Sequence, residues 1–289
     1  MTFTCNVCGN RNEWSGGSLD REQPSCARCK SNVRMRAVVH ALSQELFGVS
    51  LRLTDFPLIK SLRGIGLSDA NQYAERLAER FDYRNTFFDR EPRLDITNPG
   101  PEHIGQYDFL IASEVFEHVA PPVERAFEAA HRLLKPSGVL ILTVPYSLEK
   151  STVEHYPASG NFGVAQVDGQ TVVVRRKETG EFEVFDRPVF HIGCSGAALE
   201  MREFSEAGLR DALGAAGFGE VRVCSERYEP FGIAQSEPWS LPIVARKGSF
   251  VLGREAVRDA VTDWQRLIER FGAMARSRWF RLGARMGWY

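Results

Sequence analysis

The sequence lacks several features that define specialised classes of protein. No apolar run reaches the roughly eighteen residues of a membrane-spanning helix. The first residues, Met-Thr-Phe-Thr-Cys, lack the basic and then apolar segments of a secretory leader. The formal net charge of −1 gives no overall basic field, which weighs against a protein whose main task is to grip a long nucleic acid. With 43% hydrophobic and 25% charged residues among 289, we expect an ordinary globular protein located in the cytoplasm.

Residues 1–32 also lack hydrophobic periodicity, so burial of an apolar core does not explain how this segment would fold. Four of the six cysteines lie here as two Cys-x2-Cys pairs. They are Cys5, Cys8, Cys26 and Cys29. Four thiolates at this spacing can surround one tetrahedral Zn²⁺, which would then serve as the core. A redox or disulfide role is the alternative, and the other two cysteines, Cys194 and Cys224, are expected to be small apolar fillers.

From Val33 onward, helical patterns alternate with short apolar strands. A helix is expected to begin at Val33, and a strand over 58–66 is followed by a helix that begins at Asn71. The later expected elements are a strand over 84–88, a buried strand over 107–113, a helix over 123–134 and a strand over 139–144. This alternation predicts an open α/β sheet.

Polar residues follow the expected strands, at the edge where an open α/β sheet binds its ligands. The apolar strand that begins at Tyr107 ends on Ser113 and Glu114, and Glu117 and His118 come next. A carboxylate in this position is also suited to capping the free N–H groups of a following helix.

The first expected turn carries Gly64 and Gly66. Glycines there let the backbone approach a ligand, although an ordinary tight turn is the alternative. Asp89 and Glu91 follow about twenty residues later, the interval that brings an acid to a ribose diol in nucleotide-binding folds. Asp95, in a short third strand or the loop beside it, is a candidate partner for an exocyclic amine. Each of these acids is also consistent with solvated loop charge.

Two longer motifs carry a resemblance to a known family. Residues 107–119 read Tyr-Asp-Phe-Leu-Ile-Ala-Ser-Glu-Val-Phe-Glu-His-Val, and residues 132–141 read Arg-Leu-Leu-Lys-Pro-Ser-Gly-Val-Leu-Ile. With the glycine turn, they resemble the class I S-adenosylmethionine-dependent methyltransferases, most closely the small-molecule group labelled type 11. The resemblance covers about 61–146, with a looser match to 246. It implies a Rossmann-like doubly wound sheet that binds S-adenosylmethionine.

The resemblance also implies roles for individual residues. In the family, the first turn holds the methionine part of the cofactor, which here points to Gly64, Gly66, Ser68 and Asp69. This turn departs from the family pattern, because Leu62 stands where an acid is usual and Ser68 where a third glycine is usual. Asp69 is the expected replacement for the acid. The remaining implied residues are Asp89 and Glu91 for the ribose, and Asp95, Ser113 and Glu114 beside the cofactor's adenosine.

Four parts of the chain are expected. They are a zinc ribbon over 1–32, a linking helix over 33–57, a methyltransferase domain over 58–247 with an insertion over 147–203, and a basic amphipathic helix over 248–289. Turn signals such as Asp168-Gly169 predict that the insertion is a β-rich lid. The last helix mixes arginines with tryptophans, so it could dock on an anionic membrane or a protein partner, or pack within its own domain or a homodimer.

The resemblance implies methyl transfer, and we expect a hydroxyl of a small-molecule or glycan acceptor. His191 and His118 are the candidate general bases, with Glu117 beside them, because an imidazole titrates near neutral pH. A histidine bonded within a loop is the alternative for His191. The pattern of Glu114, Glu117 and His118 also resembles the Mg²⁺ site of small-RNA 2′-O-methyltransferases, so Mg²⁺ is a further candidate cofactor.

Two other functions stay open at this stage. A zinc ribbon before this fold also resembles bacterial ribosomal RNA guanine methyltransferases, and four basic residues lie beside the ribbon. They are Arg28, Lys30, Arg34 and Arg36. The third possibility is a scaffold protein that keeps the fold without turnover.

Overall fold

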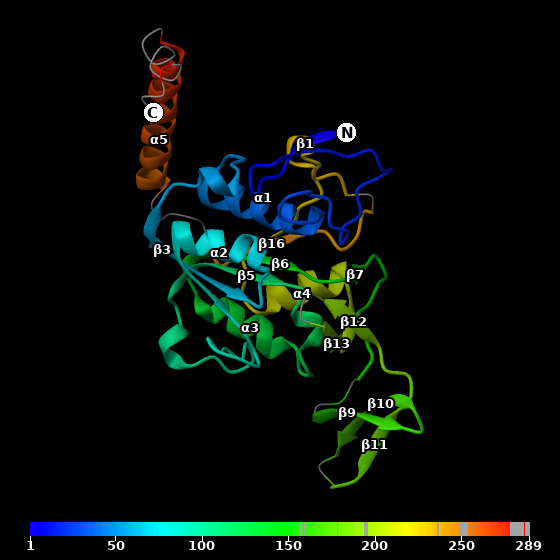
Figure 1. Ribbon diagram of the computed structural model, residues 1–289. Coiled ribbons are helices and arrows are strands. Elements are labelled where there is room, and N and C mark those ends of the chain that lie inside the picture. The colour runs from blue at the N-terminus through cyan, green and yellow to red at the C-terminus, as the bar shows by residue number, and fades with distance from the viewer. Residues whose placement is uncertain are drawn as a thin grey trace.

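The computed structural model describes residues 1–156, 158, 160–177, 179–193, 196–235, 237–248, 254–277 and 286. The side chains of 191–197, 254–260 and 263 lie outside this description. A six-stranded sheet with the strand order β15-β16-β6-β5-β3-β4 forms the centre (Figure 1). The strands are β3 Ile59–Leu67, β4 Phe81–Thr86, β5 Tyr107–Ser113, β6 Leu134–Thr143, β15 Glu220–Val223 and β16 Ile243–Arg246. Strands β3 to β6 run parallel, so their carboxyl ends meet at one edge, whereas β16 is antiparallel to both β6 and β15.

Alternate residues of the central strands enter two separate cores. Ile111 and Ile141 pack with the first two helices, and Leu110 and Leu140 pack with the next two. The helices are α1 Val33–Phe47, α2 Asn71–Arg80, α3 Glu124–Leu133 and α4 Glu206–Ala215. Strands that are buried on both faces read as continuous apolar runs, which explains the pattern of β5 and β6. The expected Rossmann-like, doubly wound α/β fold is confirmed.

Some elements differ in detail from the sequence-based expectations. The helix α1 occupies the first part of the linking segment expected over 33–57, and its Val38 and Leu42 share a core with the sheet residues Ile111 and Ile141. Of the two alternatives for the segment around Asp95, a short strand or a loop, the structure has the loop, with only an isolated bridge between Phe87 and Arg93 beside it. Short 3₁₀ helices complete this part of the fold: η1 Leu53–Asp55, η2 Pro101–His103, η3 Phe116–His118 and η4 Glu229–Phe231.

Residues 1–32 form a four-cysteine module that lies against α1 and η4. A two-stranded antiparallel ribbon, β1 Thr2–Thr4 and β2 Arg11–Glu13, begins the module. Arg36 of α1 is fully buried, with its guanidinium 4.6 Å from the centre of the Phe3 ring. It donates hydrogen bonds to the carbonyls of Ser31 and Gly232 at 3.0 Å each. The module is therefore held to the body by buried polar contacts as well as by apolar packing.

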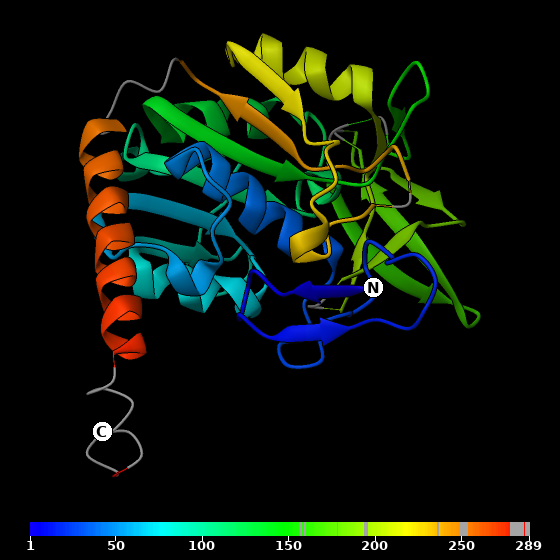
Figure 2. The same cartoon turned by 90° about the horizontal axis from the view of Figure 1, so that it is seen from above.

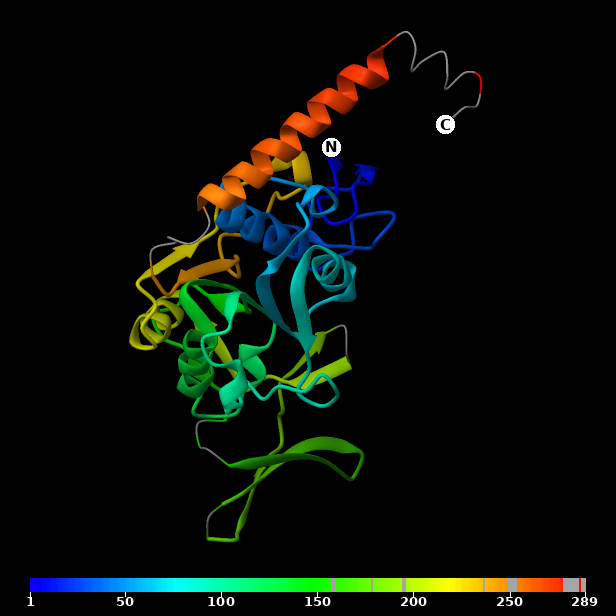
Figure 3. The same ribbon diagram turned by 90° about the vertical axis from the view of Figure 1, so that its left-hand side faces the viewer.

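The expected β-rich insertion is present and extends away from the body of the protein (Figures 1 and 3). A three-stranded antiparallel sheet forms its outer part, and two smaller sheets join it to the body. The strands are β7 Tyr146–Ser147, β8 Val153–Glu154, β9 Asn161–Val167, β10 Gln170–Arg176, β11 Phe182–Phe185, β12 Phe190–Gly193, β13 Gly196–Leu199 and β14 Arg202–Ser205. The expected turn at Asp168-Gly169 lies where β9 meets β10, and a second turn signal, Thr179-Gly180, lies where β10 meets β11.

The last helix, α5 Arg254–Arg276, runs along one side of the molecule and extends beyond it (Figures 2 and 3). Leu267, Phe271 and Met274 are each more than half exposed on this helix. Within the described part of the chain, none of the helices combines the length and apolar content needed to cross a bilayer.

Candidate functional site

The carboxyl ends of β5 and β6 form the floor of the candidate site. Ser113 ends β5, and its hydroxyl lies 2.8 Å from the hydroxyl of Thr143 at the end of β6. Glu114 follows with a φ of 58°, and its N–H donates to the Thr143 carbonyl at 2.8 Å. A left-handed conformation is uncommon outside glycine and often occurs at functional turns. The chain therefore leaves β5 through a sharp, hydrogen-bonded turn.

Two arginines from the N-terminal part of the chain reach this turn. Arg21 of the four-cysteine module donates from Nη2 to Glu114 Oε1 at 2.6 Å and from Nη1 to Glu114 Oε2 at 3.2 Å. Arg34, in the first turn of α1, donates from Nη1 to the Ser113 hydroxyl at 2.5 Å. Its Nε lies 3.8 Å from Glu114 Oε1. The four-cysteine module therefore contributes one wall of the site, which the spacing of the cysteines alone does not reveal.

The electrostatics of Glu114 depend on these arginines. Burial of the carboxyl raises its pKa, but Arg21 and Arg34 outweigh burial and lower the pKa to about 2. Glu114 is therefore an ionised, paired carboxylate throughout the neutral range.

Gly64 and Gly66 lie within β3, paired with β4 and β5, and not in the turn expected there. The chain turns only after β3, from Ser68 onward. A side chain at Gly64 would collide with the Phe109 ring, and one at Gly66 would collide with the Tyr83 hydroxyl and the Asp69 carboxyl. Ser68 has a φ of 55°, and its N–H donates to the Thr86 carbonyl at 2.7 Å. In the described conformation, the space beside these glycines is therefore filled by the protein's own side chains and not by a ligand.

Asp69 lies beneath this turn rather than in solvent. It is 3% exposed, its Oδ1 accepts from the Tyr73 hydroxyl at 2.7 Å, and its Oδ2 accepts from the Tyr83 hydroxyl. Asn85 of β4 accepts from the Asp69 N–H at 2.9 Å. Burial raises the pKa of Asp69 to about 7, although the two tyrosine hydrogen bonds oppose that rise.

The other acids expected at the cofactor lie in the loop that follows β4. Asp89 and Glu91 are exposed, and Glu91 accepts from the Arg93 N–H at 3.0 Å. Asp95 is half-buried, and its Oδ1 accepts from the N–H and the hydroxyl of Thr97 at 2.9 and 2.7 Å. The loop begins at the same edge of the sheet as the turn at Ser113, because β4, β3 and β5 are parallel.

Glu117 and His118 lie on η3, immediately after the turn at Glu114. Glu117 is fully buried, and its Oε1 lies 3.6 Å from Nε2 of His118. His118 Nδ1 lies 2.9 Å from the carbonyl oxygen of Leu199 in β13. Because a carbonyl only accepts, Nδ1 carries the proton in this contact, and Nε2 of the neutral ring is the nitrogen that can take a second one.

Arg202 and the pair of His155 and Glu200 support this region and were not predicted. Arg202 is fully buried, donates to the carbonyls of Phe116 and Val119 at 3.1 and 2.6 Å, and pairs with Glu154 at 2.7 Å. His155 Nε2 lies 3.2 Å from Glu200 Oε1. In the sequence, the sign that Arg202 could be buried is its position close to the apolar residues Met201 and Phe204.

The side chain of His191 lies outside the described residues. Its backbone belongs to β12, opposite Ala198 of β13. The role of His191 as a general base therefore stays a prediction.

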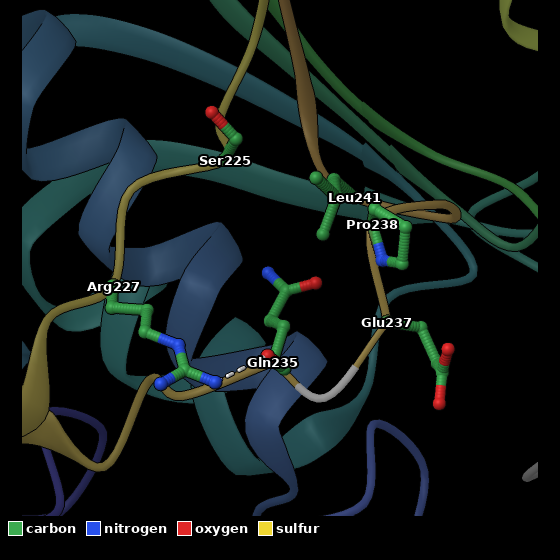
Figure 4. Close-up of a pocket in the computed structure, with 6 residues that line it drawn as sticks. All are labelled: Ser225, Arg227, Gln235, Glu237, Pro238 and Leu241. Atoms are coloured by element: carbon green, nitrogen blue, oxygen red, sulfur yellow. Dashed lines mark hydrogen bonds between the residues drawn. The ribbon is translucent and has the colours of Figure 1, made fainter.

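A shallow cavity of about 270 Å³ lies at the same edge of the sheet, beside β15 and β16 (Figure 4). The lining residues are Ser225, Arg227, Gln235, Glu237, Pro238 and Leu241. Arg227 Nη2 donates to the Gln235 carbonyl at 3.3 Å. The cavity adjoins the turn at Glu114 through Ser240, whose carbonyl accepts from Arg21 Nε at 2.8 Å.

The four cysteines of the N-terminal module converge on one point. Their sulfur atoms all lie within 4.8 Å of one another, and three of the four side chains are buried. Each Cys-x2-Cys turn closes with a backbone hydrogen bond, from Gly9 to Cys5 and from Lys30 to Cys26. Both donors have positive φ, 76° and 60° respectively. The two pairs are therefore built as matching knuckles.

The geometry of the sulfur atoms fits a tetrahedral zinc ion. Zn–S bonds of about 2.3 Å place tetrahedral sulfurs about 3.8 Å apart. Here the separations are 3.7 Å between Cys5 and Cys29 and 3.6 Å between Cys8 and Cys26. A hydrogen bond from Cys5 lowers the pKa of Cys29 to about 4, although burial opposes it. In the described part of the chain this is the single cluster of three or more potential ligands, and Glu114, Glu117 and His118 do not form another.

Comparison with known proteins gives a match over the part of the chain that contains β4 and β5 and most of β3, whose carboxyl ends lie at the candidate site. Residues 60–140 match the family model of a methyltransferase domain. The resemblance to the class I methyltransferases is confirmed. The matched residues include most of β3, all of β4, β5, α2 and α3, and the start of β6.

One curated relative and several solved structures match longer stretches of the chain than the family model does. The chain is 30% identical over 142 residues to a ubiquinone biosynthesis O-methyltransferase of Marinobacter nauticus, over 48% of this chain and 52% of that protein. The chain thus spans about half the length of that curated relative. Among solved structures, the CurJ carbon methyltransferase gives a TM-score of 0.44 at 14% identity, over 76% of this chain and 56% of that one. The sugar N-methyltransferase KedS8 from a Streptoalloteichus species gives 0.40 at 14% identity, over 73% and 85%.

The polar groups at the sheet edge of the matched region suit the chemistry of S-adenosylmethionine. Arg21 and Arg34 are cations that can meet a carboxylate. The exposed Asp89 and Glu91 can accept hydrogen bonds from ribose hydroxyls. In the described conformation, however, Arg21 and Arg34 are already paired with carboxylates of the protein.

Proposed function

We propose that this protein transfers a methyl group from S-adenosylmethionine to a hydroxyl of a small-molecule or glycan acceptor. The observation that carries the proposal is the end of β5, where Ser113, the left-handed Glu114 and the pair of Glu117 and His118 follow one another within the matched domain. In a doubly wound sheet, this edge is where ligands bind. The O-methyltransferase relative supports oxygen as the accepting atom.

When bound, S-adenosylmethionine supplies an electrophilic methyl group on a sulfonium. On the protein side, the turn that includes Ser68 would hold the methionine part, with Gly64 and Gly66 in the last part of β3 leading into it and Asp69 bracing it through Tyr73 and Tyr83. The remaining residues proposed to hold the cofactor are Asp89 and Glu91 at the ribose, and Asp95, Ser113 and Glu114 beside the adenosine. Their contribution is to fix position, since an in-line displacement gains most from orientation.

The acceptor is proposed to lie beside η3 and the insertion. His118 Nε2 would take the hydroxyl proton as the acceptor oxygen bonds to the methyl carbon and the carbon–sulfur bond breaks, which leaves S-adenosylhomocysteine. The buried Glu117 carboxylate would stabilise the imidazolium that forms. Arg202 holds the backbone of η3 and so positions both groups. His191 of the insertion is the alternative base.

RNA has less support as the acceptor than a small molecule or a glycan. A net charge of −1 does not favour RNA as the acceptor, and two of the four basic residues beside the cysteines are already engaged. Arg34 pairs with Glu22, and Arg36 is buried in hydrogen bonds within the protein. The exposed apolar residues of α5 support a partner or a membrane surface for that helix, although the helix takes no part in the proposed chemistry.

The proposal is tested with methyl-labelled S-adenosylmethionine and the zinc-loaded full chain. A panel of catechols, sugar nucleotides and oligosaccharides serves as acceptors, with a small-RNA arm at low and high salt. We expect label on a hydroxyl of a small acceptor. Labelling of RNA alone, with the strong salt dependence of phosphate contacts, would replace this proposal with the RNA alternative.

A further inference from the structure

Glu22 of the four-cysteine module holds a position that a ligand carboxylate would suit. Its two oxygens accept from Arg34 in a forked pair, Nε to Oε1 at 2.7 Å and Nη2 to Oε2 at 2.8 Å. Oε1 also contacts Nη1 of Arg21. Asn32 Nδ2 donates to Oε2 at 3.1 Å. Two guanidinium groups and an amide thus converge on a single carboxylate.

This position lies above the floor of the candidate site. Arg34 donates to Ser113 at the end of β5. Burial raises the pKa of Asp69 and Tyr73 beside the turn after β3, and the charge of Arg34 opposes that rise at both residues. The Glu22 carboxylate therefore lies next to the carboxyl ends of β3 and β5, which are neighbours in the sheet.

The two carboxylates that share these arginines differ in exposure. The Glu114 side chain is 10% exposed, whereas the Glu22 side chain is 43% exposed. A forked arginine–carboxylate pair has the same geometry whether the carboxylate belongs to the protein or to a ligand. Because Glu22 itself is partly exposed, its carboxylate can be hydrated when it leaves the arginines, so it is more easily displaced than Glu114.

We propose that Glu22 is an internal substitute for a ligand carboxylate, and that the methionine carboxylate of the bound cofactor replaces it between Arg21 and Arg34. This inference rests on the proposed function, because it takes S-adenosylmethionine as the ligand. In the unliganded protein, Glu22 keeps two like charges neutralised. On binding, Glu22 turns outward to solvent and the cofactor carboxylate takes over both arginines.

The proposal makes Glu22 a competitor of the cofactor. Glu22→Gln keeps the size of the side chain but removes its charge, so the arginines are left with less compensation before the ligand binds. We expect the Kd of S-adenosylhomocysteine to fall roughly fivefold in this variant. The control is Glu13→Gln, which removes one exposed carboxylate from β2 of the same module.

The experiment is calorimetry with zinc-loaded full chains and two probes. S-adenosylhomocysteine carries the methionine carboxylate, and 5′-methylthioadenosine lacks the whole amino-acid part. Tighter binding of S-adenosylhomocysteine by Glu22→Gln, with an unchanged Kd for 5′-methylthioadenosine and no effect of Glu13→Gln, supports the exchange.

An equal gain for both probes would overturn the exchange, because it would mean that Glu22 acts through general charge or by obstructing entry. An unchanged Kd for S-adenosylhomocysteine in Glu22→Gln would overturn it as well, while leaving the proposed function in place. Absence of S-adenosylhomocysteine binding by both proteins would overturn the proposed function itself.

Discussion

Nη2 of Arg21 lies 2.6 Å from Oε1 of Glu114, although the two residues are 93 positions apart in the sequence. The contact joins the four-cysteine module to the turn that ends β5. A cysteine-rich module at one end of the chain is thereby connected to the edge of the sheet where the cofactor is proposed to bind. The integrity of the module and the affinity of the site should therefore depend on each other.

Replacing Arg21 with alanine should destabilise the folded protein at neutral pH. Glu114 would lose both hydrogen bonds from Arg21 and keep the more distant Arg34 as its cation, so a nearly buried carboxylate would have less compensation. We expect a loss of about 2 kcal/mol in the free energy of unfolding. Urea denaturation of Arg21→Ala measures it, with Arg28→Ala, an exposed arginine of the same module, as the control.

The same pair predicts how this loss depends on pH. The pKa of Glu114 is lowered in the folded protein to about 2, so its pairing stabilises the fold above the unfolded pKa of about 4.5. That stabilisation is lost as the pH falls toward 2. The difference between the wild type and Arg21→Ala should therefore shrink in acid, and a difference that stays constant down to about pH 3 would contradict the role given to this pair.

Removal of the metal should affect the cofactor site as well as the four-cysteine module. We expect about one zinc ion per purified chain, and its loss on chelation or in Cys26→Ser. Since the cysteines fix the loop that carries Arg21, the zinc-free protein should bind S-adenosylhomocysteine at least about tenfold more weakly. Metal analysis and calorimetry measure both effects, and Cys224→Ser is the control outside the cluster. Unchanged affinity in zinc-free protein would show that the module does not shape the site.

The sequence predicted the sheet, the helices and the cysteine cluster well, because each depends on local pattern. The apolar runs of β5 and β6 and the Cys-x2-Cys spacing carry their meaning within a few residues. The contact of Arg21 with Glu114 depends on how the module folds back over the sheet, which no local pattern records. The same holds for Arg202, whose hydrogen bonds to η3 and Val119 span 86 and 83 positions. The sequence also predicts a turn at Gly64 and Gly66, but both lie inside β3, where the packing of Phe109 and Tyr83 leaves no room for a side chain.

Asp69 should make stability fall as the pH rises through the weakly acidic range. Its pKa is about 7 in the folded protein and near 4 when unfolded, so the folded state binds more protons between those values. Stability should decrease from about pH 4 to about pH 7 by up to roughly 4 kcal/mol relative to Asp69→Asn, and the difference should then level off. Thermal unfolding of the two proteins across this range tests the assignment. A parallel pH dependence in both would show that Asp69 is already ionised at low pH.

Loss of the general base should lower turnover without removing cofactor binding. His118→Ala is expected to reduce kcat about 100-fold or more, while leaving the Kd of S-adenosylhomocysteine close to that of the wild type. His191→Ala distinguishes the alternative base, and His131→Ala, on α3 against Phe218, is the control. If both His118→Ala and His191→Ala keep wild-type turnover, positioning alone drives the reaction.

The central claim is that the carboxyl edge of β3 and β5 binds S-adenosylmethionine. Calorimetric titration of the zinc-loaded full chain with S-adenosylhomocysteine tests it most directly. We predict saturable binding at about one site per chain with a Kd in the micromolar range, weakened in Ser113→Ala. No binding heat at millimolar S-adenosylhomocysteine would contradict the claim and leave a methyltransferase fold used for another purpose.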